Sequence, residues 1–164
     1  KKIKDTLDKA ILDFSQDKSL VGQETSSSDL GELDLLTVET PSDDQIKALL
    51  QRWLSAKAQV LSGDEKQDFS AFARKRLANR VFKERAKDKA RGEKQIISTF
   101  ISSMQVESKT NKRISVKVNI NYQDKRINSL GEIVSETLIP SLKVQYVLGR
   151  DKKTWQLVDY VSGS

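Results

Sequence analysis

The side chains able to do chemistry in this sequence are carboxylates, lysines, serines and tyrosines, because its 164 residues include no histidine and no cysteine. Histidine is the side chain that most often transfers protons near neutral pH, and histidine and cysteine are the usual zinc ligands. Their absence excludes most hydrolase mechanisms and the metal sites built from these two residues. We therefore predict a protein that is not an enzyme and that has no catalytic residue, no cofactor and no metal site.

Two carboxylate pairs, Asp43–Asp44 and Asp64–Glu65, are the remaining candidates for acid–base work. The first pair lies in the opening turn of a predicted helix, where acidic groups interact favourably with the helix dipole, and the second follows the helix-ending Gly63. A serine–lysine pair that uses Lys57 lacks a Ser-x-x-Lys motif, and the seven glycines are scattered singly rather than gathered in a phosphate loop. These patterns favour structural roles for the polar residues.

A basic stretch between residues 73 and 94 holds ten basic side chains against three acidic ones, in a chain of net charge +6. Such a stretch could bind a polyanion through residues 74–94. However, Glu84, Asp88 and Glu93 interleave with the cations and can form i to i+4 pairs, and no aromatic platform accompanies them. The pattern favours a helix face that meets water or anionic lipid over specific nucleic-acid binding.

The elements that position these side chains begin with a helix predicted over residues 42–63. Ser42 stands three residues before Gln45, which forms a capping-box motif, and Gly63 provides a stop. Between them runs an apolar stripe of Ile46, Leu49, Leu50, Trp53, Leu54, Val60 and Leu61. A second helix is predicted over residues 68–91, with a break into two helices near Asn79 as an alternative, and it ends at Gly92.

After Gly92 the apolar period changes from helical to two, which predicts strands. The predicted strands are 96–106, 114–122, 133–138, 142–148 and 155–161, and the predicted turns are 109–112, 123–126 and 149–153. Pro140 is expected to bend or interrupt one of these runs. Helices followed by consecutive strands predict an α+β fold in which N-terminal helices pack on a curved antiparallel sheet, a half-barrel of cystatin or NTF2-like outline.

The first 41 residues form a separate region in this prediction. Helical spacing over residues 3–14 predicts an N-terminal helix, and residues 15–41 predict a flexible linker, so that residues 42–164 form the interaction domain. No apolar run is long enough to span a bilayer. Because the sequence begins at Lys1 without an initiator methionine, we expect it to be a soluble piece of a longer protein.

A resemblance to a known family rests on two short motifs. The segment Gln51–Lys57, with sequence QRWLSAK, resembles the Trp-Leu-x-x-Lys opening of the C-terminal domain of the J-domain-like division proteins of cyanobacteria and chloroplasts. The segments Lys143–Leu148 and Trp155–Leu157, separated by a charged turn, are similar to that family's closing pair of strands. The resemblance spans about residues 42–161, with the same order of helices and strands between the motifs.

The resemblance implies an extracytoplasmic domain, on the periplasmic or intermembrane-space side, that follows a single membrane span. It implies a scaffold protein that tethers the division ring to the envelope, and in plastids a domain that receives the tail of an outer-envelope division protein. The sequence departs from the family at Arg91–Gln95, where an aromatic-rich stretch is usual. No partner residue is carried over from the family, because only Trp53, Lys57, Tyr146 and Trp155 match its motif positions and three of these are predicted core residues.

The leading hypothesis is a non-catalytic protein-interaction domain of a membrane-anchored cell-division scaffold, which binds a peptide or tail of another division or envelope protein and no specific nucleic acid. Candidate partner-binding residues from the basic face and the pocket mouth are Arg80, Lys83, Tyr122, Arg126 and Tyr146. One alternative is an NTF2-like pocket that binds a small molecule or is weakly catalytic; a pocket filled by Trp53, Phe100, Tyr122 and Trp155 would argue against it. Another is a polyanion binder through residues 74–94.

Overall fold

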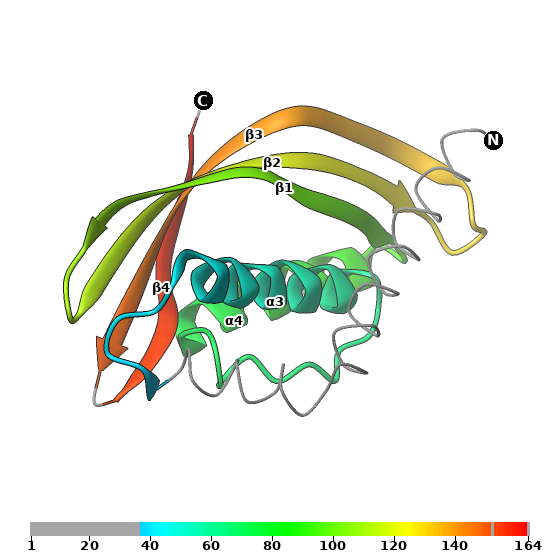
Figure 1. Ribbon diagram of the computed structural model, residues 1–164. Helices are drawn as coiled ribbons and strands as arrows, with labels where there is room; N and C mark the ends of the chain where they lie inside the picture. The colour runs from blue at the N-terminus through cyan, green and yellow to red at the C-terminus, as the bar shows by residue number, and fades with distance from the viewer. Residues whose placement is uncertain (1–36, 152, 164) are drawn as a thin grey trace, which may run out of the picture.

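Residues 37–151 and 153–163 are described by a computed structural model, in which two helices pack against a four-stranded antiparallel sheet (Figure 1). The elements follow in the order α3 (Asp43–Leu61), α4 (Lys75–Ala90), β1 (Lys94–Lys109), β2 (Arg113–Ile127), β3 (Ile133–Asp151) and β4 (Thr154–Gly163). This order confirms the predicted α+β class. The helix predicted over residues 3–14 and the linker up to residue 36 lie outside the described residues.

Helix α3 begins at the predicted capping box. The Gln45 N–H donates to Ser42 Oγ at 3.2 Å, and the Ser42 N–H donates to Gln45 Oε1 at 2.9 Å. These two hydrogen bonds satisfy backbone donors that the start of a helix leaves unpaired. Past the other end, Gly63 has a φ of 114°, a conformation that favours glycine. The helix predicted over residues 42–63 is confirmed.

Replacing Ser42 by alanine should lower the free energy of unfolding by about 1 kcal/mol, because an N-cap side chain typically contributes that much. Ser42→Asp is the matched control, since aspartate caps equally well and should stay within about 0.5 kcal/mol of the wild type. Urea unfolding followed by far-UV circular dichroism measures both variants. Equal losses in the two would contradict a capping role for this side chain.

Helix α4 is shorter than predicted: it begins at Lys75 and runs through Asn79 without the break given as an alternative. Residues 68–74 do not belong to it. They form a turn and then a single parallel bridge to β4, where the Arg74 N–H donates to Leu157 O at 2.9 Å. The turn buries Phe69 at the spacing expected of a helix, and this is why the apolar pattern was misleading.

The four strands lie in the order β1-β2-β3-β4, and the sheet bends over both helices (Figure 1). Strand β1 contains two bulges against β2, between Ile101 and Ser103 and between Val106 and Ser108, which bend and twist a sheet locally. Strand β3 is one continuous strand, so of the two effects expected of Pro140, a bend or an interruption, the interruption does not occur. Pro140 sits in a bulge against β2, and a bulge tolerates a residue that lacks an N–H.

The turn predicted over residues 123–126 is also wrong, because β2 continues to Ile127 and pairs these residues with both β1 and β3. The turn lies further on, where the Leu130 and Glu132 N–H groups donate to Asn128 Oδ1. Gly131 completes it with a φ of 79°. Residues 123–126 resembled a turn because all four are polar; within the strand, Arg126 pairs with Asp88 on α4 and Asp124 accepts a hydrogen bond from Tyr122.

The hydrophobic core lies between the concave face of the sheet and the two helices. Its largest members are Trp53 from α3 and Trp155 from β4, both fully buried as predicted. The Trp155 indole N–H donates to Val38 O at 2.7 Å, so the one polar atom of this side chain is satisfied. Alternate residues of β2, from Ile114 to Ile120, fill the space between them.

Candidate functional site

The candidate site is the space between α3 and the concave face of the sheet, where NTF2-like folds were expected to hold a pocket. It contains a cavity of about 60 Å³. Its walls come from α3 and all four strands: Trp53, Leu54, Lys57, Ala58, Ile97, Thr99, Ile120, Tyr122, Leu142, Val144, Tyr146, Tyr160 and Ser162. Pockets for small molecules usually measure about 300–1,000 Å³, so this cavity has room for a few water molecules at most.

Aromatic rings occupy the space that a ligand would need. The Trp53 and Tyr160 ring centroids lie 5.7 Å apart, and those of Tyr146 and Tyr160 lie 6.1 Å apart. Lys57 enters from the side of α3 and places its Nζ 5.6 Å from the Tyr160 ring, a cation–π contact. Phe100, one of the four residues whose filling of the pocket would argue against the small-molecule alternative, points away from it and is 66% exposed.

Two tyrosines of this site, Tyr122 and Tyr146, have a raised pKa. Burial raises the pKa of Tyr122, and the hydrogen bond that its hydroxyl donates to the Asp124 carboxylate raises it further. Burial likewise raises the pKa of Tyr146, with a smaller contribution from the neighbouring Tyr160. A phenol with a raised pKa can donate a hydrogen bond but is a poor base or nucleophile near neutral pH.

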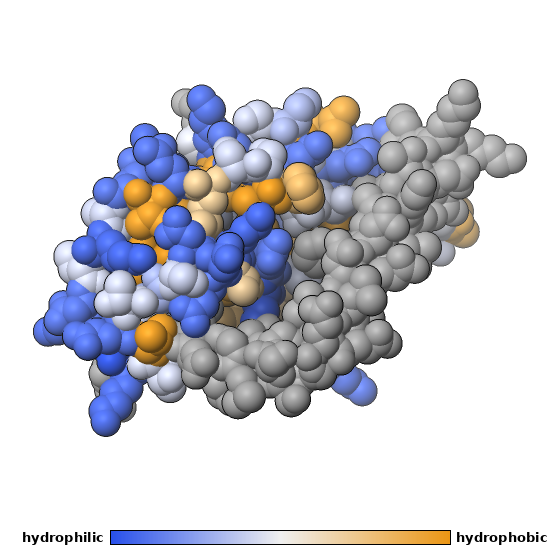
Figure 2. All heavy atoms as spheres, viewed as in Figure 1, coloured by the Kyte–Doolittle hydropathy of each residue, from blue (hydrophilic) through white to orange (hydrophobic). Residues whose placement is uncertain are grey.

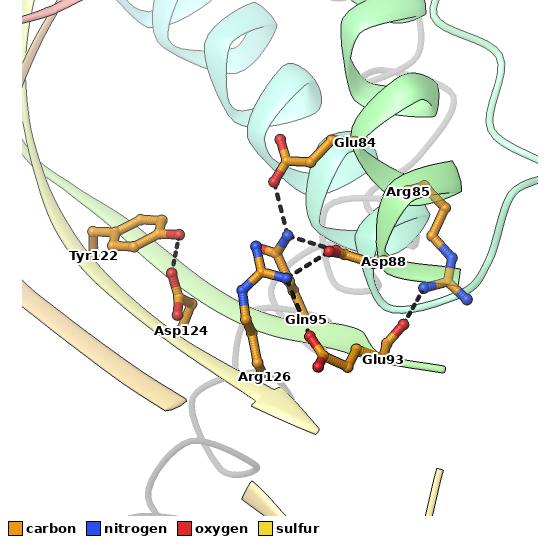
Figure 3. A network of polar contacts seen from close by, with 8 residues as sticks. All are labelled: Glu84, Arg85, Asp88, Glu93, Gln95, Tyr122, Asp124 and Arg126. Carbon is orange, nitrogen blue, oxygen red and sulfur yellow. Dashed lines mark hydrogen bonds and ion pairs between the residues drawn. The ribbon is translucent and has the colours of Figure 1, made fainter. Parts of the chain in front are cut away.

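Beside the cavity, a polar cluster joins α4 to strands β1 and β2 (Figure 3). Asp88 is 1% exposed and accepts hydrogen bonds from Gln95 Nε2 at 2.8 Å and from Arg126 Nη1 at 2.5 Å. Gln95 also donates to Glu84 Oε2 at 2.7 Å, and Arg126 lies 3.7 Å from Glu93 Oε1. This polar cluster (Glu84, Asp88, Glu93, Gln95 and Arg126) fastens the helix layer to the sheet.

The ionisation of Asp88 follows from two opposing effects. Burial alone would raise its pKa, but the hydrogen bonds from Gln95 and Arg126 and the positive charge of Arg126 together outweigh it. The pKa of Asp88 is therefore held below its ordinary value of 3.8. A carboxylate kept ionised and occupied by two donors is suited to stabilising the fold rather than to exchanging protons.

The five predicted partner-binding residues fall into three places. Tyr122 and Tyr146 line the same cavity, as the strand register suggested. Arg126 belongs to the polar cluster and is 29% exposed. Arg80 and Lys83 lie on the exposed face of α4, outside both the cavity and the cluster.

Sequence reasoning missed two residues of the cavity, Lys57 and Tyr160. Lys57 stands four residues after Trp53, which places both on one side of α3. Tyr160 is out of phase with Trp155 and Leu157, because a register shift in the β3–β4 pair changes which residues of β4 face inward. The alternation of apolar residues could not reveal that shift.

Neither a metal site nor a membrane span is found in the described ranges. Among residues 37–151 and 153–163, no group of three or more carboxylates is placed to hold a metal ion. Within the same ranges, neither α3 nor α4 is long and apolar enough to cross a membrane.

Comparisons with known proteins give a consistent picture. The family described as "ARC6-like, IMS domain" matches residues 47–158. No curated protein matches the chain. The crystal structure of the intermembrane-space region of chloroplast protein ARC6 is similar, with a TM-score of 0.58 and 11% sequence identity over 74% of this chain and 95% of that one. An NTF2-like family protein from Streptomyces avermitilis is similar with a TM-score of 0.50 and 13% identity, over 73% of this chain and 93% of that one. At these identities the two structures show a shared fold.

Proposed function

The chain belongs to the family of ARC6-like intermembrane-space domains, and from this premise we propose that it is a non-catalytic protein-interaction domain of a membrane-anchored cell-division protein. In this proposal the domain lies outside the cytoplasm. Its partner is another division or envelope protein, which places a peptide or tail at the mouth of the cavity between α3 and the sheet. The complex helps to tether or position the division ring.

The observation that supports a non-catalytic function is that side chains nearly fill the space between α3 and the concave face of the sheet. The cavity of about 60 Å³ is several times smaller than the pockets in which small molecules usually bind. Tyr122 and Tyr146 ionise even less readily than an ordinary phenol, because burial raises the pKa of both. This filling supports recognition at the surface over turnover of a small substrate.

The mouth of the cavity has the chemistry to hold one side chain of a partner. Leu54 and Leu142 are partly exposed there and offer apolar contact. Lys57 adds a positive charge and makes no ion pair with a carboxylate within residues 37–151 and 153–163. An apolar side chain next to a carboxylate, as at the end of a tail, fits this combination.

The predicted partner residues take three roles in this proposal. Arg80 and Lys83 attract an acidic partner to the side of α4, because both are exposed cations. Tyr122 and Tyr146 shape the mouth from the sheet side, and Arg126 holds β2 against α4 beneath it. Because Tyr146 is buried and Tyr122 is half-buried, a partner can touch at most the edges of their rings.

Site-specific photocrosslinking tests the proposal. A benzoylphenylalanine residue at Leu54, in the mouth, should crosslink to one saturable protein of the envelope fraction. The matched control carries the same residue at Phe100, which is exposed on the opposite face of the sheet. Identical crosslinks from both positions, or a mouth that captures only nucleic acid or ribosomes, would contradict the proposal.

A further inference from the structure

Three basic segments that are far apart in the sequence meet at one end of the domain. They are the start of α4 (residues 74–76), the β1–β2 hairpin (residues 109–113) and the β3–β4 hairpin (residues 150, 151 and 153), which together we call the hairpin-end patch. The Arg150 N–H donates to Lys112 O at 3.0 Å, which joins the two hairpins. Arg76 Nη2 donates to Val158 O at 2.9 Å, which joins α4 to β4. Figure 1 shows both hairpin tips and the start of α4 together at the lower left.

Two carboxylates hold the patch together and leave most of its charge uncompensated. Asp151 forms ion pairs with Arg74 and, at 3.8 Å, with Arg113, while Asp159 lies 3.7 Å from Arg76. The patch itself contains eight basic residues and one acidic residue in the described ranges. Most of these cations are exposed, and Figure 2 shows mainly hydrophilic residues over this end of the molecule. The patch therefore presents a strong positive charge to its surroundings.

The placement of these charges works against the stability of the fold. Helix α4 has no acidic residue in its first turn and no side-chain cap, and its first residues are Lys75 and Arg76. Cations at a helix N-terminus oppose the helix dipole, whereas α3 carries Asp43 and Asp44 at the same position. Basic segments from three elements also repel one another where they meet. A sequence selected for stability alone would not collect them on one end, so an anionic partner accounts better for the pattern.

We propose that the hairpin-end patch docks the domain onto an anionic membrane surface. None of the residues in its three segments is apolar or aromatic, so the patch offers neither anchors for a peptide nor stacking platforms for bases. The two hairpins border an open hollow lined only by polar residues, Asn111, Lys112, Arg150 and Asp151, so it too offers no apolar anchor. Exposed lysines and arginines gathered on one end of the domain suit a layer of lipid phosphates, where each basic residue near the surface contributes about 1 kcal/mol of attraction.

The test measures flotation of the 164-residue chain with vesicles of phosphatidylcholine, with and without about 30 mol% phosphatidylglycerol. The wild type should bind the anionic vesicles alone, and this binding should weaken steeply as the salt concentration rises from about 50 to about 300 mM. The patch variant combines Lys75→Glu, Lys112→Glu and Lys153→Glu, all at exposed positions. It should bind about 100-fold more weakly, since three attractive charges become repulsive.

The matched control combines Lys66→Glu, Lys87→Glu and Lys94→Glu, which are also exposed and change the net charge equally. It should lose less than about fivefold in vesicle affinity, because its charges lie away from the patch. A stability measurement separates loss of binding from loss of the fold. Lys75→Glu alone should raise the urea midpoint of unfolding, since it removes a cation from a helix N-terminus. Equal losses in the two triple variants would overturn the proposal. Tighter binding to a single-stranded oligonucleotide or to polyglutamate than to the vesicles would overturn it as well.

Discussion

Trp53→Ala should lower the free energy of unfolding by about 4 kcal/mol, the largest effect we expect from a single substitution in this chain. Trp53 is 1% exposed and packs its ring 5.6 Å from that of Phe69 and 5.7 Å from that of Tyr160. It also lines the small cavity, so its removal would merge a new void with existing empty space. The cost therefore combines lost burial of a large side chain with an unfilled cavity.

Urea unfolding followed by far-UV circular dichroism gives this free energy without relying on the fluorescence of the removed tryptophan. Phe100→Ala is the matched control, because Phe100 is also a large aromatic side chain but is 66% exposed on the outer face of the sheet. It should change stability by no more than about 0.5 kcal/mol. If Trp53→Ala lowers the free energy of unfolding by less than about 1 kcal/mol, the space between α3 and the sheet is loosely packed. That result would support the small-molecule hypothesis.

The parts of the fold that follow from local rules could be predicted from the sequence. The capping box at Ser42 and the stop at Gly63 delimit α3, because both act within a few residues of one another. Alternation along β2 gave its inward face from Ile114 to Ile120. Helices followed by strands then gave the α+β class, since neighbouring strands in sequence usually pair.

The errors arose where distant parts of the chain determine the structure. Residues 68–74 carry helical spacing, but their bridge to Leu157, more than eighty residues away, holds them in a turn. Residues 123–126 look like a turn because they are polar, but Arg126 is paired with Asp88 on α4. The real turn had a local signal, since Asn128 and Gly131 are both turn-forming residues.

The candidate site was only partly predictable for the same reason. Tyr122 and Tyr146 follow from strand alternation, whereas Tyr160 depends on a register shift that leaves no mark in the sequence. The basic stretch 74–94 was treated as one surface, but the structure divides it. Its first three residues join the two hairpins, while acidic residues in its second half take part in the polar cluster around Asp88. Charge counting along the chain cannot make that division.

Asp88→Ala should lower the free energy of unfolding by about 3 kcal/mol, because it leaves Arg126 and Gln95 without their shared acceptor. The value lies at the lower end of the range for broken buried ion pairs, since Arg126 is 29% exposed and water can reach it. Asp159→Asn is the matched control. It removes the charge of a half-exposed ion pair with Arg76 and should cost less than about 1 kcal/mol.

The effect of Asp88 should also depend on pH in a defined direction. Its pKa is lower in the folded chain than the ordinary value of 3.8, so the unfolded chain binds the proton more readily. The stability that Asp88 provides is therefore fully present above the ordinary pKa and is lost as the pH falls through the lowered one. Urea unfolding at pH 7 and near pH 3 should show the gap between the wild type and Asp88→Ala narrowing at the lower pH.

A double-mutant cycle separates the ion pair from simple loss of packing. If the pair dominates, Arg126→Met in the Asp88→Ala background should recover part of the lost stability, because it removes the unpaired charge. Additive losses in the double variant would instead show that Asp88 acts through Gln95 and the helix alone. The polar cluster would then fasten α4 to β1 and leave Arg126 free to meet a partner, which is the role that the sequence first suggested for it.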